Sequence, residues 1–484
     1  MPNSKPIDIL PTSLFFILFI FAFLLIISPS QDKTSFAASI SSNKGIVGLK
    51  AGISTLENPA KKIDLREALL LTLKRYPGIM TSKYSYKASV YAKNQSLYLY
   101  YPQISGAADF SKNSFMDVGN NGITSNRQIS YRSGLNYSVR SYSGSISATY
   151  MLYSFGSRYY GYINAKYQMK AAKSGYNYAV NSNLYNVILN FVTYFENKNL
   201  MRTDKENLKN DKIQYKAATA FYKIGTGDLL DVKTAKATME KAKATYINSI
   251  FNVKIARLAL LNSIGLPASK KYHFVNTLDF KSLQSKLADL IKTALKFNPR
   301  LKEAVYTLKA SKASVRQAVS GYFPTVNVDL SYTGENSSFP LNRNYSVGLS
   351  VSIPIFNGFL TKNKIDRSKA MLNGNIWNER LSRDNLIYNI SSDYYAILSQ
   401  YLKIKALRSS EKASKLAYKL ALKGYEIGIT PMVRLITANA AYISAETNYI
   451  NSEYTYYYMK AKLYSDLGLM LKHYVKQKNI KDKG

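Results

Sequence analysis

The stretch Tyr222-Lys223-Ile224-Gly225 decides the fold, because it returns 203 residues later as Tyr425-Glu426-Ile427-Gly428. The same offset relates Gly265 to Gly468, so the spacing of 40 residues between the two glycines is kept in both places. Matches that hold their register over this distance are typical of an internal duplication. The repeat therefore predicts two units of the same architecture in one chain.

The duplication extends toward the N-terminus with a different offset. Tyr100-Tyr101-Pro102 corresponds to Tyr322-Phe323-Pro324, 222 residues later. The change in offset indicates a 19-residue insertion in the first copy, between Pro102 and Met151. We therefore expect repeat 1 at residues 63–265 and repeat 2 at 285–468, joined by a linker at 266–284.

Each repeat has the pattern of a helix, strands, a long helix, a turn and another helix. Residues 158–224 and 360–427 contain no proline, and about 65 residues of helix extend about 100 Å. The first helix is expected from Asp64, an N-cap residue with Glu67 three positions later, to about Tyr100. These lengths favour tall antiparallel helical hairpins.

The repeated glycines mark the turns of these hairpins. Gly225 and Gly428 suit the position after a helix, with Asp228 or Thr430 as the next N-cap and Pro431 at the first helical position. Apolar residues spaced by three and four follow each turn and predict a coiled-coil seam. In the first copy they are Val232, Ala235, Met239, Ala242, Tyr246, Ile250 and Val253; in the second they are Leu435, Ala438, Tyr442, Ala445 and Tyr449.

Alternating stretches predict strands at about 103–153 and 325–354. In repeat 2, apolar residues alternate with polar ones with a period of two, which indicates strands with one apolar and one polar face. In repeat 1 the parity of the apolar residues changes at Arg140-Ser141, which predicts a bulge or an extra turn there. The stretch Lys112 to Asn126 is rich in Asn, Gly and Ser and is expected to be a long loop.

Composition narrows the classes of function. The chain has 484 residues and a net charge of +37, with no cysteine and two histidines, His273 and His473. Thiolate chemistry, disulfides and Cys-ligated metals are excluded, and no cofactor or metal is expected. A basic chain is typical of a protein that binds nucleic acid or an anionic surface. The excess lysine can partly complement anionic lipid headgroups or lipopolysaccharide, and it can equally reflect lineage composition.

The N-terminus favours export and argues against nucleic acid as a partner. Lys5 precedes the apolar run Leu14 to Ile27, which is too short to span a bilayer but fits a secretory signal. We expect a signal peptide at residues 1–37, a periplasmic segment at 38–62 and a basic tail at 469–484, which forms a solvated charge run from Lys472 to Gly484. No later stretch is long and apolar enough for a spanning helix.

Four strands cannot close a barrel, and an open sheet edge cannot face lipid. Strands that span a membrane therefore require several chains to share one barrel. Three chains would supply twelve strands, an allowed even number, although geometry alone does not fix the number three. Export, short strands and helices of about 100 Å together predict an oligomeric conduit through the envelope.

In its motifs the chain resembles the TolC family of outer-membrane efflux and secretion channels. The matching motifs are Asp64-Leu65-Arg66-Glu67-Ala68-Leu69 with Tyr76-Pro77, Tyr101-Pro102-Gln103-Ile104, Phe323-Pro324, Met151-Leu152-Tyr153-Ser154-Phe155-Gly156, Pro354-Ile355-Phe356-Asn357-Gly358, the two turns, Ile264-Gly265 and Leu467-Gly468. Their order, present twice, covers nearly the whole mature chain.

The resemblance implies a fold class and partners. The fold would be an α+β membrane protein in which four strands per chain join a shared trimeric twelve-stranded β-barrel above an α-helical periplasmic tunnel. An equatorial region would include the linker and the termini. The partners would be two further copies of the chain, a periplasmic adaptor protein, an inner-membrane transporter and outer-membrane lipid.

The resemblance also implies a periplasmic gate at the helix turns. It places Asp231 near Tyr425 as a closing hydrogen bond, and it maps an acidic pair of the family onto Arg434 and Thr437, so the acidic ring is missing here. A ring of Arg434 would attract anions. Adaptor docking would fall on the turns, at Gly225, Asp228, Gly428 and Pro431.

Three other functions compete with a passive exit duct for efflux or type I secretion. A soluble periplasmic coiled-coil scaffold or adaptor would use the same helices, but it leaves the alternating strands unexplained. A secreted hydrolase needs a pair of acids in a pocket, and no candidate pair stands out among 29 acidic residues. Nucleic-acid binding conflicts with the export signal. The sequence does not identify the cargo.

Overall fold

The structure is a computed structural model, and it describes residues 62–116, 136–269, 272–278 and 282–475. The predicted signal peptide at 1–37, the periplasmic segment up to residue 61, the tail beyond 475 and most of the predicted 112–126 loop lie outside the described residues. All elements below belong to the unit Pro59–Gly484.

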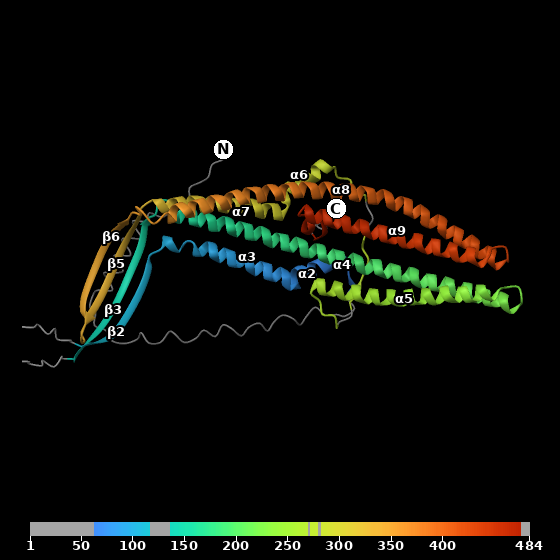
Figure 1. Cartoon of the computed structure of the whole chain (residues 1–484), viewed down its shortest axis with the longest axis horizontal. Coiled ribbons are helices and arrows are strands. Elements are labelled where there is room, and N and C mark those ends of the chain that lie inside the picture. The colour runs from blue at the N-terminus through green and yellow to red at the C-terminus, as the bar shows by residue number, and fades with distance from the viewer. Residues whose placement is uncertain (1–61, 117–135, 270–271, 279–281, 476–484) are drawn as a thin grey trace, which may run out of the picture. The chain divides into compact units, whose positions relative to one another are not determined.

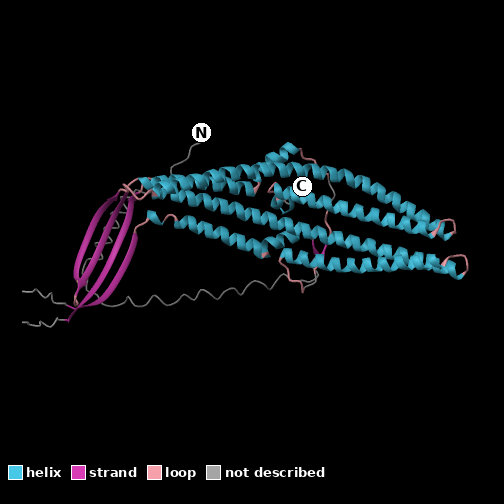
Figure 2. Cartoon of the chain, viewed as in Figure 1, coloured by secondary structure: helices cyan, strands magenta, loops and turns pink. Residues whose placement is uncertain are grey.

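Helices dominate the unit, and strands form one end of it (Figures 1 and 2). Repeat 1 contributes α2 (Leu65–Arg75), α3 (Pro77–Gln95), β2 (Gln103–Met116), β3 (Asn136–Tyr153), α4 (Ser157–Lys223) and α5 (Leu229–Ile264). Repeat 2 contributes α6 (Leu287–Phe297), α7 (Pro299–Val319), β5 (Thr325–Asn336), β6 (Asn342–Ser352), α8 (Leu360–Glu426) and α9 (Met432–Asp466). Short elements are η1 (Tyr98–Tyr100), η2 (Ser320–Tyr322), η3 (Leu471–Val475), β1 (Lys62–Ile63) and β4 (His273–Phe274).

The two repeats have matching helices. The long helices α4 and α8 each contain 67 residues, and the returning helices α5 and α9 contain 36 and 35. The proline-free stretches thus fold as predicted, because nothing in them interrupts the backbone hydrogen bonds. In both repeats the returning helix and the pair of shorter helices pack along the long helices.

The prediction of one helix from Asp64 to about Tyr100 is wrong. Asp64 is indeed the N-cap, and its carboxylate accepts a hydrogen bond of 2.7 Å from the Glu67 backbone. The helix ends at Arg75, however, because Tyr76 takes an extended conformation before Pro77, which starts α3. Repeat 2 has the same break, at Asn298 before Pro299.

The strands form one four-stranded antiparallel sheet in the order β2-β3-β5-β6. The β3–β5 pairing joins the two repeats, while one edge of β2 and one edge of β6 have no partner among the described strands. The predicted bulge at Arg140-Ser141 is wrong, because β2 and β3 pair without a shift there. The irregularity lies between Met151 and Tyr153, where β3 pairs with β5.

The helices follow the strand order. On the half next to the sheet, α4 packs against α3 and α7, and α7 packs against α8. On the other half, α4 packs against α5 and α9, and α9 packs against α8. The helices therefore form a layer with the order α3–α4–α7–α8 next to the sheet and α5–α4–α9–α8 on the other half. Helices α3 and α5 form one edge of this layer, and α8 forms the other.

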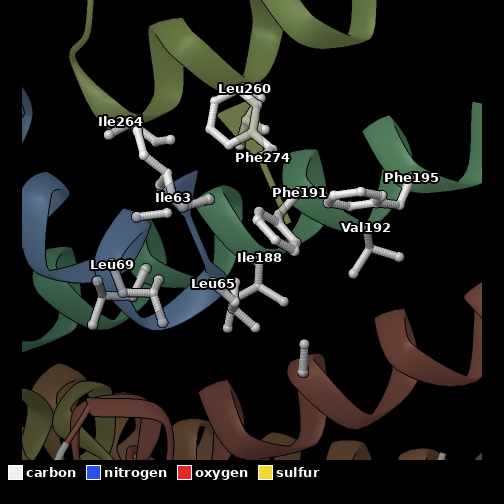
Figure 3. Packing of buried hydrophobic residues seen from close by; sticks show 14 of the residues in the cluster. Ile63, Leu65, Leu69, Ile188, Phe191, Val192, Phe195, Leu260, Ile264 and Phe274 are labelled. Atoms are coloured by element: carbon white, nitrogen blue, oxygen red, sulfur yellow. The ribbon is translucent and has the colours of Figure 1, made fainter. Parts of the chain in front are cut away.

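A central core lies where α2, α4 and α5 meet (Figure 3). Phe191 and Leu260 are fully buried in it, and Ile63 and Phe274 reach it from the parallel pair β1–β4. We use the name central core for the buried cluster Ile63, Leu65, Ala68, Leu69, Leu184, Val187, Ile188, Phe191, Val192, Phe195, Leu260, Leu261, Ile264, Leu266, Phe274, Ile450, Tyr454, Ala461 and Met470.

The chain after Gly468 packs against the central core, and the expected solvated charge run is wrong for residues 472–475. Met470 is fully buried, and its backbone donates a hydrogen bond to the Asn181 side chain over 3.3 Å. The His473 ring stacks on Tyr464, with 3.7 Å between ring centroids. Arg66 donates to the Val475 carbonyl over 3.3 Å. These contacts hold η3 against α2.

Candidate functional site

The hairpin turns at the end away from the sheet form the first candidate surface (Figure 1). Gly225 and Gly428 have φ values of 80° and 82°, which only glycine adopts without strain. The Thr226 and Gly227 backbone N–H groups both donate to the Phe221 carbonyl over 3.0 Å. A Cβ on Gly227 would lie 2.8 Å from the Tyr222 nitrogen, so this turn needs a second glycine.

The N-caps after the two turns differ. Asp228 caps α5 as predicted, and its carboxylate accepts from the Leu230 backbone over 3.2 Å. In the second turn the predicted assignment is wrong by one residue, because Pro431 is the N-cap and α9 begins at Met432. The Thr430 backbone instead donates to the Gly424 carbonyl over 3.0 Å, which draws it toward α8.

An apolar cluster lies directly behind the turns. We call it the tip cluster, and it consists of Ala218, Ala235, Tyr418, Tyr425, Met432, Leu435 and Tyr442. Several seam positions that the sequence predicts are here, since Ala235 and Leu435 are fully buried and Tyr442 is nearly so. The Phe221 ring meets the Tyr425 ring edge-on, with centroids 5.4 Å apart.

Asp231 and Tyr425, the predicted gate pair, come near each other but are not hydrogen bonded in this chain. Tyr425 is 6% exposed and Asp231 is half-buried. Burial raises the pKa of Tyr425, and the Asp231 charge raises it further. Burial, followed by the Asp228 charge, raises the pKa of Asp231. No hydrogen bond joins the two side chains in the part of the chain that the structure describes.

Arg434 and Thr437 project from the first turns of α9 into solvent. The Thr437 hydroxyl donates to the Val433 carbonyl over 2.8 Å, so it is satisfied within its own helix. Arg434 forms no ion pair with the described residues and stays available to solvent or a ligand. Whether this surface lines a pore depends on how copies of the chain assemble.

A buried polar network between α4 and α9 escaped the sequence analysis. The Asn439 side-chain N–H₂ donates to the carboxylate of Asp211 and to the side-chain carbonyl of Asn207, each over 2.9 Å. Its carbonyl accepts from Asn210 over 3.3 Å. Burial raises the pKa of Asp211 to about 6, against the lowering effect of the bond from Asn439. The available signal was Asn439 itself, a polar residue between the predicted seam positions Leu435 and Tyr442.

The sheet has one polar face, made by cross-strand rows. Ser105, Ser147, Ser331 and Ser346 lie in one row, with hydroxyl contacts of 2.8 Å and 2.7 Å within its two outer pairs. Asp329 accepts from Thr149 over 2.9 Å and from Ser350 over 3.2 Å. The charged residues on this face are carboxylates, namely Asp109, Asp329 and Glu335, within the described strands.

The opposite face is apolar, as the period of two predicts. Its rows run across all four strands, for example Ile104, Ala148, Leu330 and Val347. On β6 the side chains of this face are strongly exposed, with Tyr345 at 75% and Leu349 at 67%. Exposed apolar surface of this extent on a sheet requires cover, because water solvates it poorly.

Two further observations limit the chemistry. None of the described helices has a segment both long and apolar enough to cross a bilayer. Among the described residues, no three His, Cys, Asp or Glu side chains come together as metal ligands would. The features that stand out are thus surfaces: turns, helical edges and a two-faced sheet.

The comparisons with known proteins give this architecture its class, which is that of outer membrane efflux proteins. The model of the outer membrane efflux protein family matches residues 73–266 and 290–469, and the chain belongs to this family. The resemblance inferred from the repeated motifs is therefore confirmed.

The most informative relatives are distant. The chain is 25% identical over 195 residues to the probable efflux pump outer membrane protein TtgC of Pseudomonas putida, a match that covers 38% of this chain and 40% of that protein. Over 239 residues it is 23% identical to the outer membrane efflux protein BepC of Brucella suis, covering 47% and 48%. The chain thus matches less than half the length of these curated relatives.

A solved structure of the same fold covers more of the chain. The CmeC outer membrane channel of Campylobacter jejuni matches with a TM-score of 0.74 at 16% identity, over 91% of this chain and 94% of that one. Identity at this level shows the shared fold alone.

Proposed function

We propose that three copies of this chain form an exit duct in the outer membrane, through which cargo leaves the cell. The sheet would supply four strands per copy to a twelve-stranded barrel, and the helices would form a tunnel in the periplasm. The observation that carries the proposal is that both edges, in sheet and helices alike, lack a partner among the residues that the structure describes.

The strand directions support ring closure. Because all three pairings are antiparallel, β2 and β6 run in opposite directions. When β6 of one copy lies beside β2 of the next, that new pairing is also antiparallel. Any whole number of copies can therefore close a ring without an unpaired edge, which is what lipid exposure demands.

The helical edges support the same assembly. On α8, exposed apolar side chains form a stripe opposite the buried Leu386, Ile390 and Ile397. The stripe consists of Trp377, Leu381, Tyr388, Tyr395, Leu398 and Leu402. The other edge has its own stripe, formed by Tyr84, Tyr91, Ile247, Phe251, Ile255 and Leu258 on α3 and α5. Two apolar stripes on opposite edges favour head-to-tail contact between identical copies.

In this assembly the apolar sheet face would meet lipid and the serine-rich face would line the channel. The helix turns would form the periplasmic end, where Asp231, Tyr425, Arg434 and Thr437 border the entrance. A periplasmic adaptor would dock at the turns around Gly225, Asp228, Gly428 and Pro431. An inner-membrane transporter would supply the energy, either in a tripartite efflux pump or in a type I secretion system.

The test is envelope fractionation of the expressed protein, followed by gels of heated and unheated membrane samples. We expect an outer-membrane species near three times the mature mass that collapses to monomer on boiling. The variant Leu381→Glu/Tyr388→Glu should lose this species, because two charges would be buried in the contact between copies. The matched control Asn378→Glu/Asn385→Glu adds the same charge beside the stripe and should keep it.

A soluble periplasmic monomer would overturn the proposal. That result would support the alternative, a soluble coiled-coil scaffold or adaptor. The exposed apolar face on β6 argues against this alternative, because a soluble monomer would leave that face in water.

A further inference from the structure

The apolar face of the sheet ends in aromatic residues at both rims. At the rim next to the helices, Tyr153 lies 4.6 Å from Phe155, and Phe155 stacks on Phe323 at 5.8 Å, measured between ring centroids. At the far rim, Tyr142 lies 5.0 Å from Phe110 and 5.2 Å from Phe339. Two aromatic rows flanking an apolar band are typical of a protein that crosses a membrane, where they lie at headgroup level.

Cations follow directly beyond the far aromatic row. Lys112 and Arg140 are register partners on β2 and β3, one alternation outside the Phe110–Tyr142 pair. Their parity places them on the apolar face, and both are exposed. Arg343 has the same parity on β6, near the same rim, where it pairs with Gly334.

Two like charges directly across a strand pair destabilise a sheet. Nothing nearby offsets this cost, since the carboxylates of the described strands, Asp109, Asp329 and Glu335, lie on the opposite face. Within the described residues, Lys112, Arg140 and Arg343 form no ion pair. A cationic pair above an aromatic row, with no counterion among the described residues, would be stabilised by an external anion.

We propose that Lys112 and Arg140, joined by Arg343 of the neighbouring copy, bind phosphate groups of lipid headgroups at the outer rim of the barrel. The inference rests on the proposed assembly, in which β6 of one copy lies beside β2 of the next. Juxtamembrane Lys and Arg attract anionic headgroups, and phosphate is the anion that such headgroups carry. The site would anchor the barrel in a phosphorylated outer leaflet and fix its depth.

The experiment is native mass spectrometry of the purified trimer titrated with diphosphoryl lipid A, monophosphoryl lipid A and phosphatidylcholine. We expect affinity to rise with the number of phosphates. The variant Lys112→Gln/Arg140→Gln should bind diphosphoryl lipid A about 30-fold more weakly, at about 1 kcal/mol per lost cation. Its affinity for phosphatidylcholine should stay unchanged.

The matched control is Lys236→Gln/Lys412→Gln, which removes two exposed charges from α5 and α8 and should leave lipid affinity within about twofold. Equal affinity of the two double variants for diphosphoryl lipid A would overturn the inference. If Lys112→Gln/Arg140→Gln does not assemble, the variant Lys112→Arg/Arg140→Lys replaces it, because it keeps both charges and should keep the preference for phosphorylated lipid. Loss of that preference in this variant would contradict the inference. A wild-type chain that forms no trimer would instead refute the proposed function.

Discussion

The central core and the region behind the turns differ in the contacts that join α4 to its neighbours. Around the central core, α4 packs on α5 through side chains such as Phe191, Leu260 and Leu261, all fully buried and apolar. Behind the turns, α4 meets α9 through the Asp211–Asn439 network, beside a cluster rich in tyrosine. Apolar burial therefore holds the helices together at the middle of the fold. At the tip, polar bonds that a proton or a substitution can alter stand beside the apolar cluster.

In the proposed duct, this contrast would suit an opening at the end that carries the turns. Apolar burial is insensitive to pH and is lost only when the helices separate. A buried carboxylate held by an amide adds little net stability but imposes a geometry, and it is costly to leave unpaired. We therefore expect substitutions in the central core to affect the whole chain, and substitutions at the tip to affect the tip alone.

The largest effect is expected from Phe191→Ala in the central core. The lost ring leaves a cavity among fully buried neighbours, and we expect about 3–5 kcal/mol less stability. The measurement is thermal unfolding of the purified protein by circular dichroism. Tyr178→Ala is the control in α4, because Tyr178 is 42% exposed and belongs to neither apolar stripe. Similar losses in both variants would show that the central core is not the fastening point.

Next in size is Asn439→Leu at the tip. It leaves the buried Asp211 carboxylate without its amide donor, at a cost of about 1–3 kcal/mol. Hydrogen exchange of the α9 amides near residue 439 should accelerate, while exchange around Phe191 stays unchanged. The double variant Asp211→Leu/Asn439→Leu should restore most of the protection, because no buried carboxylate then remains unpaired. Faster exchange throughout the chain would contradict a separate tip.

The tip should also respond to pH through Asp211. Its pKa is raised to about 6 in the folded chain, against an ordinary value near 3.8. Between about pH 4 and 6 the folded state therefore binds more protons than the unfolded chain, and the stability of the tip falls as pH rises through this window. Exchange-derived stability of the α4–α9 contact should be about 1 kcal/mol higher at pH 5 than at pH 7.5.

The control for this pH dependence is Asp211→Asn, which keeps the shape of the side chain and cannot titrate. The groups facing Asp211 are Asn207 and Asn210 on its own helix and Asn439 from α9, and none of them titrates in this range. Tyr418 on α8 interacts with the Asp211 charge, but burial raises the pKa of Tyr418 above its ordinary value. A pH response that survives in Asp211→Asn would arise elsewhere.

A smaller effect is expected from Asp231→Ala at the entrance. If Asp231 helps to hold neighbouring turns closed, its removal raises single-channel conductance in planar bilayers. Tyr425→Phe separates the two roles of the tyrosine, since it keeps the packing against Phe221 and loses the hydroxyl. Unchanged conductance in both variants would leave Tyr425 as a packing residue only.

The smallest effect is expected from Arg434→Glu, because an exposed charge is screened by salt. If Arg434 borders the pore, three reversed charges shift the reversal potential in a salt gradient toward cations. Lys412→Glu, at an exposed position of α8, is the control. No shift in either variant would place Arg434 outside the conduction path.

The sequence predicted the features that depend on local pattern. Gly225 and Gly428 located the turns, because the left-handed conformation there favours glycine. The absence of proline gave α4 and α8 their length, and the period of two gave the strands and their faces. The break at Tyr76 was not predicted, although Pro77 favours an extended conformation in the residue before it.

The candidate site was predictable only in part. Asp228 was recognised as an N-cap because a cap is a local feature. The Asp211–Asn439 bond joins residues 228 positions apart in the sequence. The cation pair Lys112–Arg140 depends on the strand register, for which the change in parity gave a wrong prediction. Tyr425 was assigned to the gate by resemblance, yet it is mostly buried against Phe221.

The sequence by itself determined the duplication, the helical hairpins, the strand faces and the family, because each rests on the order and spacing of neighbouring residues. Tertiary structure alone decided the β3–β5 junction, the docking of residues 469–475 on the central core and the polar contact at the tip. These depend on which distant surfaces meet. That is settled by the packing of whole helices, whose burial energy no short stretch of sequence contains.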